Sequence, residues 1–188
     1  MPCDHPVDRG LLCAAQTWGI PKAVFEALHE GFQWDSSERQ YETIEELIEY
    51  CVRVASTVGV MMTLVMGESS VPTLARACDL GVAFQLTNIA RDVGEDARNG
   101  RVYLPEAWLR DEGLSSKALI ADPRISEPLR KVIDRILRVA DQIYVDAEVG
   151  VRMLPSTCQA IVGRCGEVSC TYIHLRGVTP TLGIDRER

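Results

Sequence analysis

The sequence predicts an all-α protein, and three observations support that fold class. Apolar residues recur every three or four positions in several long blocks, which is the spacing of one face of an α-helix. The alternation of apolar and polar residues that is typical of strands is scarce, and no internal repeat is found. With 188 residues and 46% hydrophobic residues, the chain is long enough to bury one ordinary core. We therefore expect a single helical domain over residues 1–188.

Two helices are predicted in the first part of the chain. The earlier one is expected from Pro21 to about Gly31, with proline in its first turn and glycine after its end. The later one follows the capping-box pattern Thr43-Ile44-Glu45-Glu46 and is expected to run for about six turns. Its predicted apolar stripe consists of Ile44, Ile48, Cys51, Ala55, Val58, Met62 and Val65.

A third helix is predicted from Pro72 to about Ala97, where Asn99-Gly100 ends it. Proline and glycine residues recur through residues 101–124, which predicts a connector with one brief helix. The connector is expected to join the third helix to a fourth.

The fourth helix is predicted to begin after Ser126 and to end near Gly150 and Pro155. Its expected inner face consists of Leu129, Ile133, Ile136, Ala140, Ile143 and Ala147. Beyond Cys158 glycine and proline recur, so we expect only a few helical turns there. We interpret the tail from about residue 158 as divergent.

Charge and cysteine content exclude several kinds of partner and site. The net charge of -7 and the pI near 5.0 argue against a nucleic-acid partner, because surfaces that bind phosphate backbones are rich in Lys and Arg. The seven cysteines are odd in number and contain no C-x-x-C pair. We interpret them as reduced, mostly buried thiols rather than zinc ligands.

No targeting or spanning segment is predicted from the sequence. The first residues, MPCDHPVDRG, lack the basic start and apolar run of a signal peptide. The longest apolar stretch, Val58–Met66, is too short to span a bilayer. We expect a cytoplasmic protein, and peripheral contact with a membrane surface stays open for an apolar substrate.

A polar ridge on the third helix is the strongest sign of chemistry. Gln85, Asn88, Asp92 and Asp96 are spaced three, four and four residues apart, so they lie within an arc of about 80° on a helix. The apolar residues Val82, Leu86, Ile89, Ala90 and Val93 occupy an adjoining arc. The ridge is therefore predicted to border the core.

Two carboxylates at positions i and i+4 repel each other, so Asp92 and Asp96 favour a cation between them. Carboxylate and amide oxygens suit Mg²⁺, which keeps several waters and shares its remaining positions with substrate phosphates. From the spacing alone, a solvated helix face is the simpler interpretation of these acids.

A longer sequence pattern favours a metal site over a solvated helix face. The run DLGVAFQLTNIARDVGEDARNGRVYLP, from Asp79 to Pro105, resembles the signature of bacterial members of the squalene/phytoene synthase family. The block YCVRVASTVGVMM, from Tyr50 to Met62, resembles the helix that lines the prenyl pocket of that family, and residues 39–43 resemble the segment before it. The resemblance extends over about residues 5–155.

This resemblance implies an isoprenoid-synthase-type helical bundle and assigns roles to particular residues. Asp92 and Asp96 would be the catalytic acids of a D-x-x-x-D motif, and Asn88 would help them to hold Mg²⁺ on a diphosphate. Arg91 would donate hydrogen bonds to that diphosphate. Tyr50, Val54, Val58, Gly81 and Gln85 would line the cavity for the isoprenoid chains, although ordinary core packing explains Tyr50 and the valines nearly as well.

The reaction implied by the resemblance is the head-to-head condensation of two geranylgeranyl diphosphates to phytoene. It passes through a cyclopropyl diphosphate and depends on Mg²⁺, with Mn²⁺ as an alternative ion and without NADPH. Two alternatives stay open: a squalene or presqualene diphosphate synthase, and a non-catalytic relative that keeps the fold as a binding module. The retained pair of repelling carboxylates argues against the binding module.

The chain also departs from the family pattern. We expect the upstream part that carries the family's first aspartate-rich motif to be absent, so the bundle would be incomplete. Asp4 and Asp8 have D-x-x-x-D spacing, which we interpret as accidental because no helical pattern flanks them. Ser56 stands where the family commonly has glycine. A separately supplied N-terminal part is therefore one expected partner, besides the prenyl diphosphate.

Overall fold

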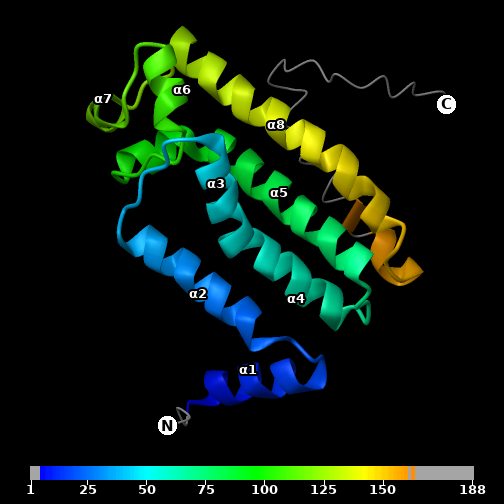
Figure 1. Cartoon of the computed structure of the whole chain (residues 1–188). Helices are drawn as coiled ribbons and strands as arrows, with labels where there is room; N and C mark the ends of the chain where they lie inside the picture. The colour runs from blue at the N-terminus through cyan, green and yellow to red at the C-terminus, as the bar shows by residue number, and fades with distance from the viewer. Residues whose placement is uncertain (1–4, 161, 164–188) are drawn as a thin grey trace, which may run out of the picture.

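The computed structural model describes residues 5–160 and 162–163, and these residues form helices but no strand. The all-α prediction is therefore confirmed for the described residues. Figure 1 shows the helices in chain order: α1 (Pro6–Thr17), α2 (Lys22–Ser36), α3 (Ile44–Cys51), η1 (Val52–Ser56), α4 (Thr57–Val65), α5 (Val71–Arg98), α6 (Glu106–Asp111), α7 (Ser116–Ala121) and α8 (Glu127–Val151).

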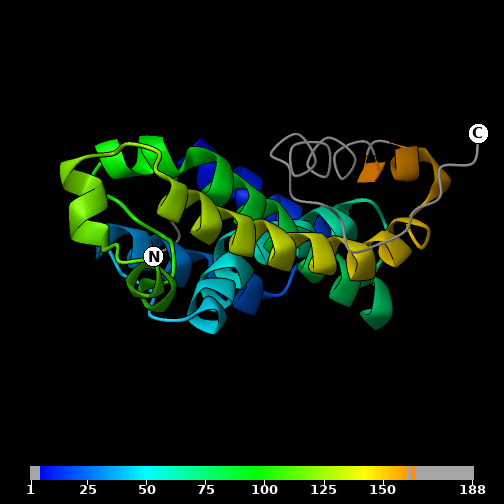
Figure 2. The same ribbon diagram turned by 90° about the horizontal axis from the view of Figure 1, so that it is seen from above.

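Helix α5 is the central helix of the bundle and lies side by side with α8, which forms one edge of the bundle in Figure 1; Figure 2 shows the same arrangement from above. Leu86 on α5 meets the core together with Ile136 and Leu137 on α8, and all three side chains are fully buried. Burying an aliphatic side chain of this size contributes roughly 1.5–3 kcal/mol. The predicted inner face of the fourth helix is confirmed, except that Ile143 is only half-buried.

The predicted six-turn helix is interrupted by a π-helical turn, η1, between α3 and α4. A π-turn adds one residue to the helical repeat, so the side chains beyond it are rotated relative to the predicted stripe. Val58, Met62 and Val65, which were expected to face the core, are 43%, 48% and 38% exposed. That part of the predicted stripe is therefore wrong.

The rotation buries hydroxyl groups instead, and each one is satisfied by a backbone carbonyl. Ser56 Oγ donates to Cys78 O at 2.7 Å, and Thr63 Oγ1 donates to Gly59 O at 2.8 Å. Thr57 Oγ1 donates to Arg53 O at 2.7 Å. A buried hydroxyl without a partner would cost free energy, so these bonds explain why an apolar helix carries them.

By length and composition, the continuous helix Ile44–Val65 could cross a membrane, with a mean hydropathy of 1.4. Its contacts with α2 and α5 are those of a helix packed within a bundle. Length and composition alone are weak evidence for a membrane span, because the core helices of bundles pass the same test.

The helix predicted to end at Gly31 continues to Ser36. Gly31 is buried where α2 crosses η1, and a Cβ atom there would lie 2.6 Å from Val54 Cγ1. This glycine therefore permits close helix packing and does not end the helix. The longer α2 carries Asp35 in its last turn.

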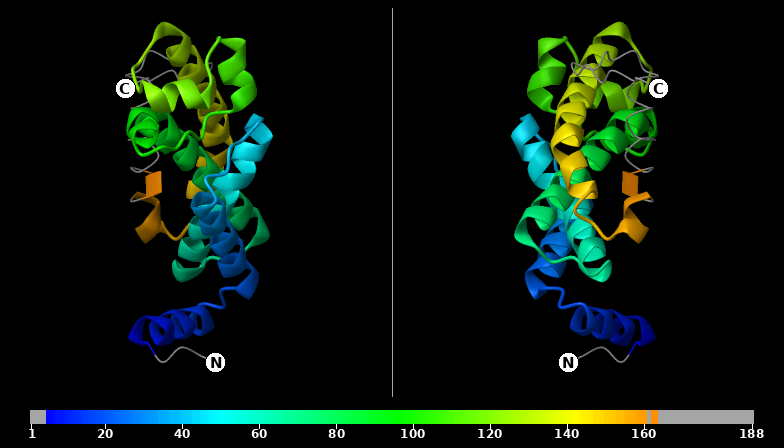
Figure 3. Two further views of the ribbon diagram at one scale, coloured as in Figure 1. Left: turned by 90° about the vertical axis from the view of Figure 1, so that its left-hand side faces the viewer. Right: turned by 90° about the vertical axis from the view of Figure 1, so that its right-hand side faces the viewer.

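Helix α1 was not expected, and it places Asp8 in a regular first turn that begins at Pro6. None of its residues is buried, and Figure 3 shows that it projects from one end of the bundle. In Figure 1 that end lies opposite the C-terminal end of α5. Helix α1, which carries Asp8, therefore lies away from the C-terminal end of α5, and Asp4 lies outside the described residues.

The connector contains two short helices, α6 and α7, where one was predicted. Ser115 caps the second, since its Oγ accepts a hydrogen bond from Ala118 N at 3.2 Å. The tail that was predicted to diverge lies largely outside the described residues. Cys13, Cys51, Cys78 and Cys158 are free thiols, but only Cys51 among them is buried, so the prediction of mostly buried thiols is wrong for these four residues.

Candidate functional site

The predicted polar ridge exists and lies along α5. Gln85, Asn88, Asp92 and Asp96 are all half-buried, whereas Val82, Leu86, Ile89, Ala90 and Val93 beside them are buried. The ridge therefore borders the core, as the spacing predicted.

The carboxyl group of Asp96, at the end of the ridge, lies among other negative charges. Burial, followed by the charges of Asp92 and Glu95, raises the pKa of Asp96 to about 6. Arg101 opposes this shift, and Asp35 adds to it. A bound cation would favour the ionised form of Asp96, so the electrostatics of the ridge fit a divalent ion.

The donor set also fits Mg²⁺. Asn88, Asp92 and Asp96 offer amide and carboxylate oxygens at successive turns of one helix, and all three are partly accessible to solvent. Within residues 5–160 and 162–163, no three or more His, Cys, Asp or Glu side chains are gathered closely enough to hold a metal on their own. An ion here would therefore depend on water and substrate oxygens for its remaining ligands.

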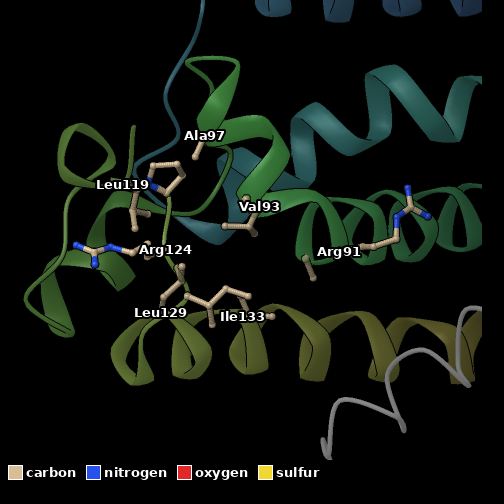
Figure 4. Close-up of a pocket in the computed structure, with 11 residues that line it drawn as sticks. Arg91, Val93, Ala97, Leu119, Arg124, Leu129 and Ile133 are labelled. Atoms are coloured by element: carbon tan, nitrogen blue, oxygen red, sulfur yellow. The ribbon is translucent and has the colours of Figure 1, made fainter. Parts of the chain in front are cut away.

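Arg91 is bound to its neighbour on the ridge. Its Nε donates to Asp92 Oδ1 at 2.7 Å, and its Nη2 donates to Asp92 Oδ2 at 2.6 Å. Arg91 also borders a small hollow of about 30 Å³ between α5, α7 and α8, and its guanidinium points away from Leu129 and Ile133 there (Figure 4). To meet a diphosphate, Arg91 would have to exchange the Asp92 carboxylate for the ligand.

An apolar cavity of about 430 Å³ adjoins the other end of the ridge. Its walls come from η1, α4, α5 and the end of α8, and five of the predicted site residues contribute to them: Val54, Val58, Gly81, Gln85 and Asn88. Gln85 and Asn88 therefore belong both to the polar ridge and to the apolar cavity. The cavity volume lies within the range of small-molecule sites.

Gly81 was predicted to line the cavity, but helix packing explains why this position is a glycine. A Cβ atom there would lie 2.7 Å from both Cα and N of Ser56, so the missing side chain admits the backbone of η1. Gly81 also lines the cavity, but helix packing is what excludes a larger residue. Ser56 itself fits because its hydroxyl is bonded to Cys78 O.

Tyr50 does not line the cavity but belongs to a buried aromatic cluster. Its ring lies 5.3 Å from the rings of both Tyr41 and Tyr103. Its hydroxyl donates to Asp35 Oδ1 at 2.8 Å, and the hydroxyl of Tyr103 donates to the same oxygen at 3.1 Å. Burial, followed by the bond to Asp35, raises the pKa of Tyr50.

The tyrosine cluster is joined to the ridge through the turn that ends α5. Gly100 has a φ of 79°, and the turn directs Arg101 N back to Asp96 O at 2.8 Å. The side chain of Tyr103 raises the pKa of Arg101 by hydrogen bonding, and the charge of Asp35 adds to the effect. Asp35, Tyr103 and Arg101 thus form a polar group beside Asp96.

Sequence reasoning missed Asp35, Arg101 and Tyr103 as residues near the site. One signal was available for Asp35, because an acid in the last turn of a helix opposes the helix dipole. Such a residue is expected to have another partner. No spacing rule links Asp35 to Tyr103, which lies 68 residues away in sequence.

Comparison with known protein families identifies the family of this chain. Residues 1–168 match the squalene/phytoene synthase family. The chain belongs to that family. The sequence resemblance is therefore confirmed.

Several family members that this chain resembles are phytoene synthases. The chain is 43% identical to the phytoene synthase of Rhodobacter capsulatus over 89% of its own length and 49% of that protein. It is 45% identical to the phytoene synthase of Cereibacter sphaeroides over 84% of its own length and 44% of that protein. The chain spans about half the length of these relatives.

Two solved structures of the family share the fold. A squalene synthase from Alicyclobacillus acidocaldarius matches with a TM-score of 0.81 and 23% identity, over 95% of this chain and 68% of that one. A dehydrosqualene synthase bound to a ligand matches with a TM-score of 0.81 and 24% identity, over 98% and 66%. At these identities the likeness establishes the isoprenoid-synthase fold.

Proposed function

We propose that this chain carries the second aspartate-rich half of a phytoene synthase site. The reaction is the Mg²⁺-dependent, head-to-head condensation of two geranylgeranyl diphosphates. The observation that carries the proposal is the continuity of an apolar cavity with a carboxylate ridge, joined at Gln85 and Asn88. A prenyl diphosphate has the same division, because its tail is apolar and its head is anionic.

Each part of the site has a separate task in this reaction. Asn88, Asp92 and Asp96 would hold Mg²⁺, or Mn²⁺ in its place, and the bound ion would neutralise charge on the departing diphosphate. Walls such as Val54 and Val58 hold the tail and exclude water that would quench an allylic cation. Arg91 is a diphosphate donor once its contact with Asp92 opens. The proposed reaction uses no nicotinamide cofactor.

The relatives favour phytoene over squalene as the product. The phytoene synthases are 43–45% identical to this chain, whereas the squalene-type structures are 23–24% identical and bear on the fold alone. A non-catalytic relative has no use for a ridge on which burial and neighbouring charge raise the pKa of Asp96 to about 6.

We also propose a cytoplasmic location with peripheral contact to a membrane surface. The substrate tail is apolar and would reach the cavity from a lipid surface. Exposed apolar residues on α4, such as Val58 and Met62, lie at the cavity and suit such a transfer.

The test is product analysis. The purified chain is incubated with geranylgeranyl diphosphate and Mg²⁺, alone and with the N-terminal half of the Rhodobacter capsulatus relative, and the hydrocarbon is identified by mass. Phytoene is expected, and chelation of the metal should abolish it. Squalene-type products from farnesyl diphosphate alone would overturn the proposed substrate.

Asp92→Asn tests the ridge directly. Mg²⁺-dependent binding of geranylgeranyl diphosphate should fall at least a hundredfold, because one of the two carboxylates that hold the ion is lost. Asp146→Asn is the matched control, since it makes the same chemical change at an exposed position of α8. Equal binding by the two variants would remove the metal assignment.

A further inference from the structure

Asp35 lies where its charge is unfavourable unless other groups use it. It is half-buried in the last turn of α2, at the negative end of the helix dipole. Two hydroxyl groups donate to its Oδ1 atom, that of Tyr50 at 2.8 Å and that of Tyr103 at 3.1 Å. Within residues 5–160 and 162–163, Asp35 forms no direct ion pair with a basic side chain. The two tyrosines therefore hold a negative charge that has no directly paired cation.

Arg101 is the cation on which this charge acts. Hydrogen bonding with the side chain of Tyr103 raises the pKa of Arg101, and the charge of Asp35 adds to the effect. Arg101 is exposed, and it forms no direct ion pair with a carboxylate in the part of the chain that the structure describes. The position of its guanidinium therefore depends on Tyr103, whose hydroxyl is in turn fixed by Asp35.

Asp96 competes with Asp35 for the same arginine. The turn after α5 bonds Arg101 N to Asp96 O at 2.8 Å, so the arginine side chain can reach the Asp96 carboxylate. Burial and the charge of Asp92 raise the pKa of Asp96, and the charge of Arg101 lowers it. A guanidinium bound directly to Asp96 would occupy the oxygens that a divalent ion needs. The arginine and the ion would therefore exclude each other at this carboxylate.

We infer that Asp35 is a positioning residue for the metal end of the ridge: acting through Tyr103, it holds Arg101 away from Asp96 and leaves that carboxylate free for a divalent ion. The inference rests on the proposed function, because it takes Asp96 to be a ligand of the ion. Loss of the link releases the arginine to Asp96 and weakens binding of the ion. Loss of the arginine removes the competitor, and the link then has nothing to hold.

The test measures binding of Mn²⁺ alone, from the loss of the free-ion signal in electron paramagnetic resonance. Tyr103→Phe is the main variant, because it breaks the link but leaves every charge in place. It should weaken Mn²⁺ binding by about threefold, the size expected for a competing ion pair that is partly exposed. When Tyr103→Phe is added to Arg101→Met, the affinity should equal that of Arg101→Met alone. This comparison separates a released arginine from a general loss of structure.

Asp35→Asn distinguishes positioning from simple charge. It should weaken Mn²⁺ binding in the wild type but have no effect when Arg101 is already replaced by Met. An equal loss in both backgrounds would show that only the charge of Asp35 acts on the ion, and it would overturn the inference.

Tyr144→Phe is the matched control. It removes another buried tyrosine hydroxyl, which lies 3.3 Å from Thr87 Oγ1, and it should leave Mn²⁺ binding unchanged. The inference is overturned if Tyr103→Phe binds Mn²⁺ as the wild type does, or if Tyr144→Phe weakens it equally. It is also overturned if Tyr103→Phe is as harmful without Arg101 as with it, or if the wild type binds no Mn²⁺.

These titrations separate the inference from the proposed function, because they need no prenyl diphosphate and no turnover. If the variants behave as expected while no hydrocarbon forms from any diphosphate, the positioning of Arg101 stands and the proposed reaction fails. If phytoene forms but Tyr103→Phe binds Mn²⁺ as the wild type does, the reaction stands and the positioning role of Asp35 fails.

Discussion

The two ends of α5 differ in how their sequence relates to their structure. At the C-terminal end, Asn88, Asp92 and Asp96 are polar residues that border a core, and burial makes the charge of Asp96 costly. Towards the N-terminal end, Gly81 packs against η1 and Ala77 against α4, as any helix interface would. The polar end can therefore be recognised as a candidate site from its residue types, whereas the cavity at the apolar end can be recognised only in the structure.

The difference follows from what each end must stabilise. A half-buried carboxylate beside other negative charges, such as Asp96, is unfavourable, so its presence needs an explanation beyond folding. An apolar wall is favourable for folding and for binding a tail alike, and the same valine serves both. Experiments that separate the two ends must therefore perturb packing at one end and charge at the other.

The largest expected change in stability is at the apolar end. Gly81→Ala should lower the free energy of unfolding by about 2 kcal/mol, because the new Cβ meets the backbone of Ser56, which must shift. Gly10→Ala, at an exposed position of α1 with nothing within 4 Å, should raise it by roughly 0.5–1 kcal/mol through helix propensity. Urea unfolding of both variants measures the difference. Similar effects from both variants would contradict close packing at Gly81.

A somewhat smaller change is expected beside the polar end. Asp35→Asn should lower the free energy of unfolding by about 1.5 kcal/mol, since two tyrosine hydroxyls lose a charged acceptor. Tyr103→Phe should cost about 1 kcal/mol, because it removes one of the two bonds. If the double variant costs as much as the sum of the single ones, the pair is not coupled and the cluster does not act as a unit.

Much of this fold could be predicted from sequence. The capping serine at 126 and the apolar repeat after it predicted α8, and Asn99-Gly100 predicted the end of α5. The errors have local causes. Gly31 resembled a helix end, but its missing side chain serves a contact with Val54, a residue 23 positions away. The π-turn at η1 rotates Val58 away from the direction that a regular α-helix would give it, and no residue type in the sequence indicates such a turn.

The residues of the candidate site were also predicted only in part. The ridge and four of the cavity residues were predicted, because helical spacing places the ridge and family resemblance selects Val54, Val58, Gly81 and Gln85. Asp35 was missed because its partners, Tyr50 and Tyr103, come from two other segments. Tyr50 was predicted to line the cavity, but its hydroxyl turns to Asp35 instead. Contacts between distant segments are set by packing, which spacing along one helix does not specify.

The smallest predicted effect is a pH dependence at the polar end. The pKa of Asp96 is about 6 in the folded chain, above the value of 3.8 for a free aspartate. The folded chain therefore binds more protons than the unfolded chain between these values, so Asp96 lowers stability as pH rises from about 4 to 6. Asp96→Asn removes this loss and should be more stable than the wild type at pH 7 by roughly 1 kcal/mol, a figure reduced for partial exposure.

Thermal unfolding of both proteins at pH 4 and pH 7, with and without Mg²⁺, measures this effect. The difference between them should be much smaller at pH 4, because the wild-type carboxyl is then largely protonated in the folded state and partly protonated in the unfolded state. Mg²⁺ at pH 7 should stabilise the wild type more than the variant, since the ion binds the ionised carboxylate. Asp146→Asn should show neither response. A wild type that exceeds Asp96→Asn at pH 7 without Mg²⁺ would mean that Asp96 is stabilised as a carboxylate, and the ridge would not need a cation.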